Sequence, residues 1–215
     1  MKIFRLTDKL FEENAYIIVR EKDVTIIDPG FNYNKIVTFL DENNLSLNRI
    51  ILTHGHIDHI NDIDKLSSKY KDVPIYINEF DADFLLDSSL NCSRQFGNPK
   101  VFSENLNIIP VDGNALIDGF SIYHTPGHTR GSMIIKISDK LFTGDTLFKE
   151  SVGRTDLPTG SMKVLEESLT FISKTFKKDT TVYPGHYDKT TIKDELLNNT
   201  YLKKKNKGIF RRWLF

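Results

Sequence analysis

The chain contains seven histidine and aspartate residues whose types and spacing suit metal binding. Four lie within six residues and three follow at wide spacing: His54, His56, Asp58, His59, His128, Asp145 and His186. Imidazole nitrogens and carboxylate oxygens are ligands for divalent transition metals, and this set is large enough for two ions. Two such ions lower the pKa of a bound water and create a nucleophile. The pattern predicts a two-metal centre, with zinc as the default and iron or manganese as alternatives.

The local spacing indicates how these ligands converge. His54 and His56 are two residues apart, so their side chains point the same way in extended backbone. Gly55 between them permits an unusual backbone conformation and a close approach to a metal. A turn after Ile57 would direct Asp58 and His59 to a second point nearby. Asp145 has two oxygens and can bridge two ions, which lie about 3.5–4 Å apart in two-metal hydrolases.

The alternative is a group of solvated surface histidines, which is how we interpret the sixth histidine, His124. Three histidines and one aspartate within six residues argue against that alternative for the cluster. The partners further along the chain each lie in a turn that contains glycine, as in Thr125–His128, Thr143–Thr146 and Pro184–His186. Such turns can present a side chain from a fixed backbone, which favours the metal interpretation.

The elements that position these residues alternate between strand and helix. Apolar β-branched runs predict strands over 15–20, 24–28, 47–53, 73–77, 120–124, 133–137, 141–143 and 181–183. Helical spacing predicts helices over 33–44, 61–70, 161–177 and 190–202, with Ser161 as an N-cap. Segment 88–104 is expected to be an irregular loop. His54, Asp145 and His186 each directly follow a predicted strand, where α/β proteins place active sites. We expect one domain over 1–215.

Composition limits the classes of function. The 215 residues carry 29 basic and 29 acidic side chains, so no net field attracts nucleic acid or an anionic membrane surface. No apolar run approaches the roughly 20 residues that span a bilayer. Cys92 is the only cysteine, which excludes an internal disulfide. The N-terminal residues lack the apolar core of a signal peptide. We therefore expect a cytoplasmic protein that acts on a small molecule, as a monomer or homodimer.

The string His54-x-His56-x-Asp58-His59, followed by His128, Asp145 and His186, resembles the signature of the metallo-β-lactamase-fold hydrolases. The likeness extends from segment 26–30 to His186. It implies an α/β fold of four layers, an αββα sandwich of two mixed sheets with helices outside. The resemblance also implies that His54, His56 and His128 hold one metal, that Asp58, His59 and His186 hold the second, and that Asp145 bridges them. It assigns to Asp28 the orientation of a ligand histidine.

Within this family, segments 144–148 and 184–186 are similar to motifs of glyoxalase II, the hydroxyacylglutathione hydrolases. Segment 152–158 resembles the short single-domain bacterial members. The likeness implies hydrolysis of a hydroxyacyl thioester such as S-lactoylglutathione through a bridging hydroxide, which Asp58 would orient. Arg154 and Asp156 stand where the long enzymes place a lysine and a tyrosine, and only segment 187–215 follows His186, where they add a helical domain. We expect Arg154 to bind a substrate carboxylate, with pairing to Asp156 as the alternative.

Two rival activities share these motifs. Persulfide dioxygenases are similar in segment 153–156, and that likeness implies one iron held by His54, His128 and Asp145. Leu157-Pro158 departs from their pattern and favours the hydrolase. Another ester or lactone hydrolase of this fold is the further alternative. Asp145 stands where the commonest subclass of zinc β-lactamases has a cysteine, which argues against a β-lactamase.

The chain ends in a basic and aromatic tail over 203–215. Such a tail is expected to be solvated or to pack on the body of the protein. Lining the substrate mouth and mediating a dimer contact are the functional alternatives.

Overall fold

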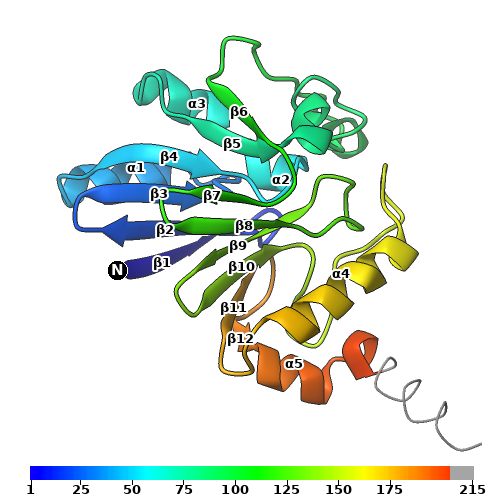
Figure 1. Ribbon diagram of the computed structural model, residues 1–215. Helices are drawn as coiled ribbons and strands as arrows, with labels where there is room; N and C mark the ends of the chain where they lie inside the picture. Colours follow the sequence, from blue (N-terminus) through cyan, green and yellow to red (C-terminus); the bar gives the residue numbers. More distant parts are fainter. Residues whose placement is uncertain (204–215) are drawn as a thin grey trace, which may run out of the picture.

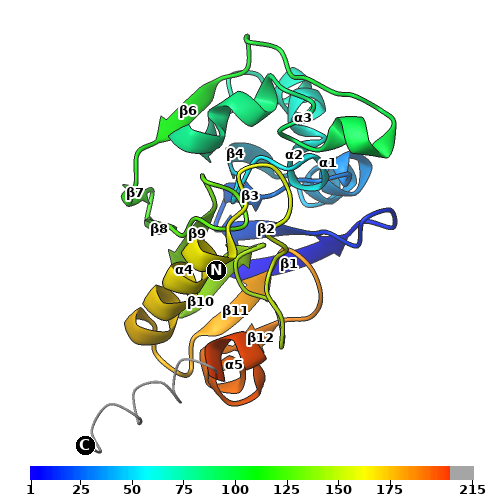
Figure 2. The ribbon, with the colours of Figure 1, turned by 90° about the vertical axis from the view of Figure 1, so that its right-hand side faces the viewer.

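The computed structural model describes residues 1–203 as two six-stranded sheets packed face to face, with helices on both outer surfaces (Figures 1 and 2). This arrangement confirms the predicted αββα sandwich. Apart from Lys203, the basic and aromatic tail lies outside the described residues. Within residues 1–203, no helix is long and apolar enough to cross a membrane.

The first sheet has the strand order β1-β2-β3-β4-β5-β6, antiparallel from β1 to β3 and parallel from β3 to β6. Its strands are β1 (Lys2–Thr7), β2 (Asn14–Arg20), β3 (Asp23–Ile27), β4 (Ser46–Ile51), β5 (Ile75–Asn78) and β6 (Ile108–Val111). The helical segments among them are α1 (Tyr33–Glu42), α2 (Ile57–Ile60), α3 (Ile63–Lys69) and the 3₁₀ helices η1 (Glu79–Leu85) and η2 (Ser93–Phe96).

The second sheet has the order β12-β11-β10-β9-β8-β7, in which only β10 and β11 pair in parallel. Its strands are β7 (Ala115–Ile117), β8 (Phe120–His124), β9 (Met133–Ile137), β10 (Lys140–Gly144), β11 (Thr181–Pro184) and β12 (Thr190–Thr191). The helices α4 (Met162–Thr175) and α5 (Ile192–Asn198) cover its outer face. The Ser161 side chain caps α4, as predicted, by accepting from the backbone N–H of Val164.

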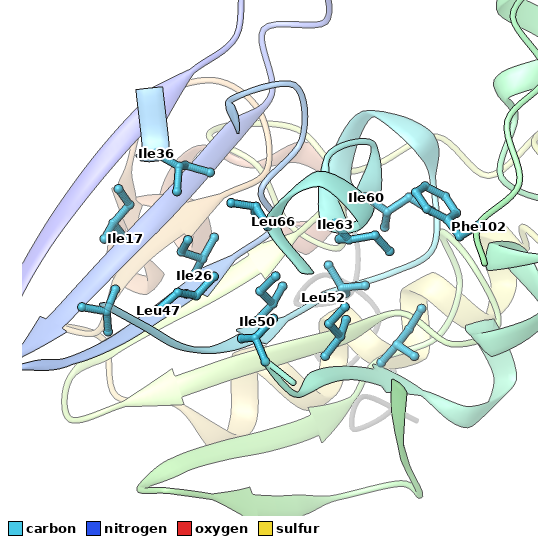
Figure 3. Close-up of a cluster of buried hydrophobic side chains, with 14 of the residues drawn as sticks. Ile17, Ile26, Ile36, Leu47, Ile50, Leu52, Ile60, Ile63, Leu66 and Phe102 are labelled. Atoms are coloured by element: carbon cyan, nitrogen blue, oxygen red, sulfur yellow. The ribbon is translucent and has the colours of Figure 1, made fainter. Parts of the chain in front are cut away.

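Three apolar clusters hold the four layers together. Successive side chains of a strand point to opposite faces, so each buried strand serves two clusters. Ile26 packs under the helices α1 to α3, whereas Ile27 faces the second sheet. Ile135 faces the first sheet, whereas Ile134 packs under α4 and α5. Figure 3 shows the first cluster, with Ile36 of α1 among its labelled side chains.

The strands that the sequence analysis did not predict are β1, β6, β7 and the two-residue β12, and all four are edge strands. An edge strand is partly exposed, so its sequence lacks the continuous apolar run of an interior strand. In β6, Pro110 removes a backbone donor, which an edge position tolerates. The predicted helix over 190–202 begins later, at Ile192, because β12 occupies its first two residues.

Candidate metal centre

The ligand-rich segment 54–59 joins the end of β4 to α2. Leu52 and Thr53 follow the strand, and His54 comes next. His56 has an extended backbone and precedes the single turn of α2, which carries Asp58 and His59. The predicted turn after Ile57 is therefore a one-turn helix.

Gly55 is required for a different reason from the one we predicted. Its φ is not positive, so no unusual backbone conformation demands glycine there. A Cβ atom at this position would instead lie 2.5 Å from Cβ of Phe84 in η1. Glycine is needed because η1 packs directly on the loop between the two histidines.

His54, His56 and His128 form the first cluster of convergent nitrogens. Nε2 of His128 lies 2.9 Å from Nδ1 of His56 and 3.2 Å from Nε2 of His54. All three residues are at most 3% exposed. In a neutral His128 the N–H lies on Nδ1, which donates to a backbone carbonyl oxygen, so Nε2 offers a lone pair at the centre of the cluster, where a cation can be bound by all three rings.

Asp58, His59 and His186 form the second cluster, and Asp145 lies between the two clusters. Nε2 of His186 is 3.3 Å from Oδ2 of Asp58. One oxygen of Asp145 is 3.3 Å from Nε2 of His59, and the other is 3.6 Å from Nε2 of His128 and 3.5 Å from Nε2 of His186. All seven predicted residues are thus brought together, and Asp145 contacts both sets.

Oriented hydrogen bonds fix the rings of this site. Asp28 accepts from Nδ1 of His59 at 3.0 Å, and its other contacts are to the backbone N–H and hydroxyl of Thr53. Nδ1 of His128 donates to the backbone carbonyl oxygen of Arg154 at 2.7 Å. In both rings the outward nitrogen is bound, so Nε2 is directed at the centre, as in many histidine–metal sites.

Burial and charge set the protonation of the donors. Burial lowers the pKa of His56 to about 3 and holds the pKa of His54 well below its ordinary value, so both rings are neutral, the form that binds a metal. Burial raises the pKa of Asp145, but His186 and His59 outweigh it and hold the net pKa well below its usual range. Burial lowers the pKa of His59, but Asp145 and Asp58 raise the net value well above normal. The carboxylates are therefore ionised, and the rings of His59 and His186, whose pKa values are raised, carry balancing protons that a bound cation would replace.

The donor set fits divalent cations. Within residues 1–203, Nε2 of His59 and Oδ1 of Asp145 are buried without a hydrogen-bond partner. Buried polar atoms are costly unless something satisfies them. The ligand atoms of His54, His56 and His128 all lie within 4.8 Å of one another. The same holds for the ligand atoms of Asp58, His59 and His186. The first group offers neutral imidazole nitrogens, the second group includes the Asp58 carboxylate, and Asp145 contacts both groups. Zinc, iron and manganese all accept such a mixture of nitrogen and oxygen ligands.

Five of the seven donors line a cavity of about 480 Å³, namely His56, Asp58, His128, Asp145 and His186. Its walls combine these polar side chains with an apolar part made by Phe96, Phe148, Val152 and Leu157. Arg154 also lines the cavity, but two of its guanidinium nitrogens contact both carboxylate oxygens of Asp156 at 2.7 Å. A larger hollow of about 770 Å³ shares His186 and Tyr187 with this cavity but contains no other candidate ligand.

The structure adds two buried acids that the sequence analysis missed. Glu13 lies with Oε1 3.9 Å from Nδ1 of His59, and burial raises its pKa well above the ordinary value. Asp81 of η1 bonds to the loops that carry His54, His56 and His128. No local motif marks either residue. His124 lies apart from the clusters, and Nε2 of its ring contacts the backbone carbonyl oxygen of Arg130.

With this fold and site, the chain belongs to the metallo-beta-lactamase superfamily, whose family model matches residues 9–186. Among curated proteins, it is 33% identical over 207 residues to the probable metallo-hydrolase YqgX of Bacillus subtilis (strain 168), covering 94% of this chain and 98% of that protein. It is 32% identical over 207 residues to the hydroxyacylglutathione hydrolase GloC of Haemophilus influenzae, covering 91% and 95%.

Two solved structures are similar over nearly the whole chain, each with a TM-score of 0.84. The BLEG-1 B3 metallo-beta-lactamase is 31% identical, and the superposition covers 94% of this chain and 99% of the BLEG-1 chain. TTHA1623, solved in a di-iron-bound form, is 30% identical, and the superposition covers 93% of this chain and 100% of the TTHA1623 chain. The chain is therefore a metallo-hydrolase of this superfamily, a fold that binds divalent metals, typically two.

Proposed function

We propose that the protein is a two-metal thioesterase that acts on hydroxyacyl thioesters, with S-lactoylglutathione as the first substrate to test. One observation carries the proposal: seven nitrogen and carboxylate donors converge in two groups, members of both groups line one cavity, and Asp145 contacts both groups. His54, His56 and His128 would hold one ion, and Asp58, His59 and His186 the other. Zinc is the default, with iron or manganese as alternatives.

Bound in this way, the two cations supply a water of lowered pKa and polarise the carbonyl of the substrate. The protein's own residues set the conditions for that chemistry. Asp58 lies at the rim of the cavity, 19% exposed at its side chain, with a pKa that the neighbouring His59 and His186 keep below normal despite burial. An ionised carboxylate in that position can accept a hydrogen bond from an attacking water and orient it.

The thioester class rests on the leaving group and on the relatives. A thiolate is a good leaving group, so cleavage of a thioester needs no dedicated general acid in the cavity. The likeness to GloC supports the hydroxyacyl-thiol substrate. The apolar walls of Phe148, Val152 and Leu157 suit the uncharged part of such a substrate. Arg154 is proposed to meet the carboxylate of the thiol carrier, in exchange for part of its contact with Asp156.

Two assays on the same metal-loaded preparation test the proposal. The first follows loss of the thioester absorbance of S-lactoylglutathione under anaerobic conditions. The second follows oxygen consumption with glutathione persulfide. We expect thioester cleavage without oxygen and no oxygen uptake. Oxygen uptake without thioester cleavage would replace the proposal with a persulfide dioxygenase, in which one iron is held by His54, His128 and Asp145.

A small substrate panel separates the remaining hydrolase alternatives. It contains an acyl-coenzyme A, a lactone and a β-lactam, the last because of the likeness to BLEG-1. The proposal requires kcat/KM for the hydroxyacyl thioester to exceed that for the lactone and the β-lactam. Faster cleavage of either would move the protein to another branch of hydrolases and leave the metal centre as described.

A further inference from the structure

Asp81 joins the two loops that carry the first histidine cluster. Its carboxylate accepts three hydrogen bonds: Oδ2 from the backbone N–H of Gly55 at 3.0 Å and from the hydroxyl of Thr129 at 2.6 Å, and Oδ1 from the backbone N–H of Gly131 at 2.8 Å. Asp81 is completely buried. Three donors on one buried carboxylate satisfy a charge that would otherwise be costly.

The positions of the three donors relate Asp81 to the candidate ligands. Gly55 lies between His54 and His56, and Thr129 directly follows His128. A single side chain from η1 therefore holds the backbone on both sides of the cluster. Asp81 is 26 residues from Gly55 and 48 from Thr129, so this bridge is a tertiary contact and not part of a local turn.

Close packing leaves η1 little freedom to shift. A Cβ atom at Gly131 would lie 2.5 Å from Oδ1 of Asp81, and one at Gly55 would lie 2.5 Å from Cβ of Phe84. Phe84 is completely buried, and its ring centroid is 5.8 Å from that of His56. The carboxylate and the aromatic ring of η1 thus meet the two loops at contact distance.

We propose that Asp81 is a positioning residue that holds His54, His56 and His128 in their convergent arrangement before a metal binds. It contacts neither the cavity nor the candidate ligand atoms, and it acts through the backbone of both loops. A metal then meets a ready-made site and does not have to order the loops itself. The inference rests on metal binding by these three histidines, as proposed above.

The test compares metal affinity in Asp81→Asn, Asp83→Asn and the wild-type protein. Asparagine keeps the size of the side chain but has one acceptor oxygen, so it cannot accept from both Gly55 and Gly131. Asp83 is the matched control, because it lies on the same 3₁₀ helix and contacts the same loop, but through an exposed ion pair with the Arg130 side chain and not through buried hydrogen bonds. Cobalt(II) is titrated into the apo-protein against a chromophoric chelator, and the visible spectrum is recorded.

We expect Asp81→Asn to bind one of the two cobalt ions about 10–100-fold more weakly, the range seen when groups that support a metal ligand are removed. Its spectrum at saturation should also differ, because the ligand geometry has changed. The Asp83→Asn variant should match the wild type. A folded Asp81→Asn protein with wild-type affinities and spectrum would overturn the proposal.

Thr129 provides a second test if Asp81→Asn does not fold. Thr129→Val removes one of the three donors with little change in volume, whereas Thr129→Ser retains the hydroxyl. We expect weaker binding of one cobalt ion in the valine variant and near wild-type binding in the serine variant. Equal affinities in the two variants would overturn the positioning role. Absence of cobalt binding by the wild type would instead overturn the metal centre itself.

Discussion

His128 and Arg154 are joined through the backbone, because Nδ1 of the histidine donates to the carbonyl oxygen of Arg154 at 2.7 Å. The loop after Asp145 thus orients a candidate ligand with its main chain. The Arg154 side chain points to a different partner, Asp156, with which it forms a two-point contact. Backbone and side chain of the same residue therefore have separable roles, which mutations can distinguish.

Gly153 makes the approach of this loop possible. A Cβ atom there would overlap the carbonyl oxygen of Asp145 and lie 3.0 Å from Nδ1 of His128. We expect Gly153→Ala to displace the loop and to weaken metal binding at least tenfold, within the range for lost ligand support. Isothermal titration with zinc measures the effect. Arg154→Ala keeps the backbone carbonyl and is the control, for which we expect unchanged zinc affinity. Equal zinc affinity in Gly153→Ala and the wild type would disprove the role of the hydrogen bond between His128 and the Arg154 carbonyl oxygen.

The Arg154 side chain is predicted to bind the carboxylate of the substrate's carrier. Arg154→Ala should then raise KM for S-lactoylglutathione several-fold with little change in kcat, the result expected for lost ground-state binding. Asp156→Ala frees the guanidinium and should leave KM equal or lower. Steady-state kinetics of both variants decide the question. If KM is untouched in Arg154→Ala, the residue only pairs with Asp156, and the glutathione-like carrier should be abandoned while the metal centre stands.

Asp58 is predicted both to hold a metal and to orient the attacking water. Asp58→Ala should lower kcat by two or more orders of magnitude, in the range expected for loss of a positioned base. The metal content of the variant is measured beside its activity, and far-ultraviolet circular dichroism checks the fold. Turnover near the wild-type rate with both ions bound would refute the orienting role.

The Ser161 hydroxyl caps α4 and makes no hydrogen bond to a candidate ligand within residues 1–203. It accepts from the backbone N–H of Val164 at a long 3.5 Å. Ser161→Ala should therefore lower the free energy of unfolding by about 0.5–1 kcal/mol, the low end for loss of an N-cap. Urea unfolding of the apo-protein measures this, and Thr191→Ala, the cap of α5, is a companion variant. An unchanged urea midpoint for Ser161→Ala would show that the cap contributes nothing.

The candidate metal ligands were easier to predict from the sequence than the groups that hydrogen-bond to those ligands. His54, His56, Asp58 and His59 are close in the chain, so their spacing alone predicts convergence. The family resemblance assigned Asp28 to a ligand histidine without saying which one, and in the fold its carboxylate lies 3.0 Å from Nδ1 of His59. The carbonyl oxygen of Arg154 could not be predicted, because every residue has one and only the folded loop brings it to His128.

Asp81 escaped prediction for a related physical reason. Its neighbours in sequence form a 3₁₀ helix with no motif, and its three partners come from segments far along the chain. In the fold, the interior strands were predicted because both of their faces are apolar, as with Ile26 and Ile27 of β3. The edge strands β1, β6 and β7 lack that pattern, and only pairing with a neighbouring strand defines them.

The metal content of the protein tests the central claim most directly. Protein purified without chelator is analysed for zinc, iron and manganese, treated with a chelator, and then reloaded with each metal. The account predicts about two ions per chain, loss of thioester hydrolysis on chelation and recovery on reloading. A protein that binds no divalent metal under any of these conditions, or that keeps full activity without one, would contradict it.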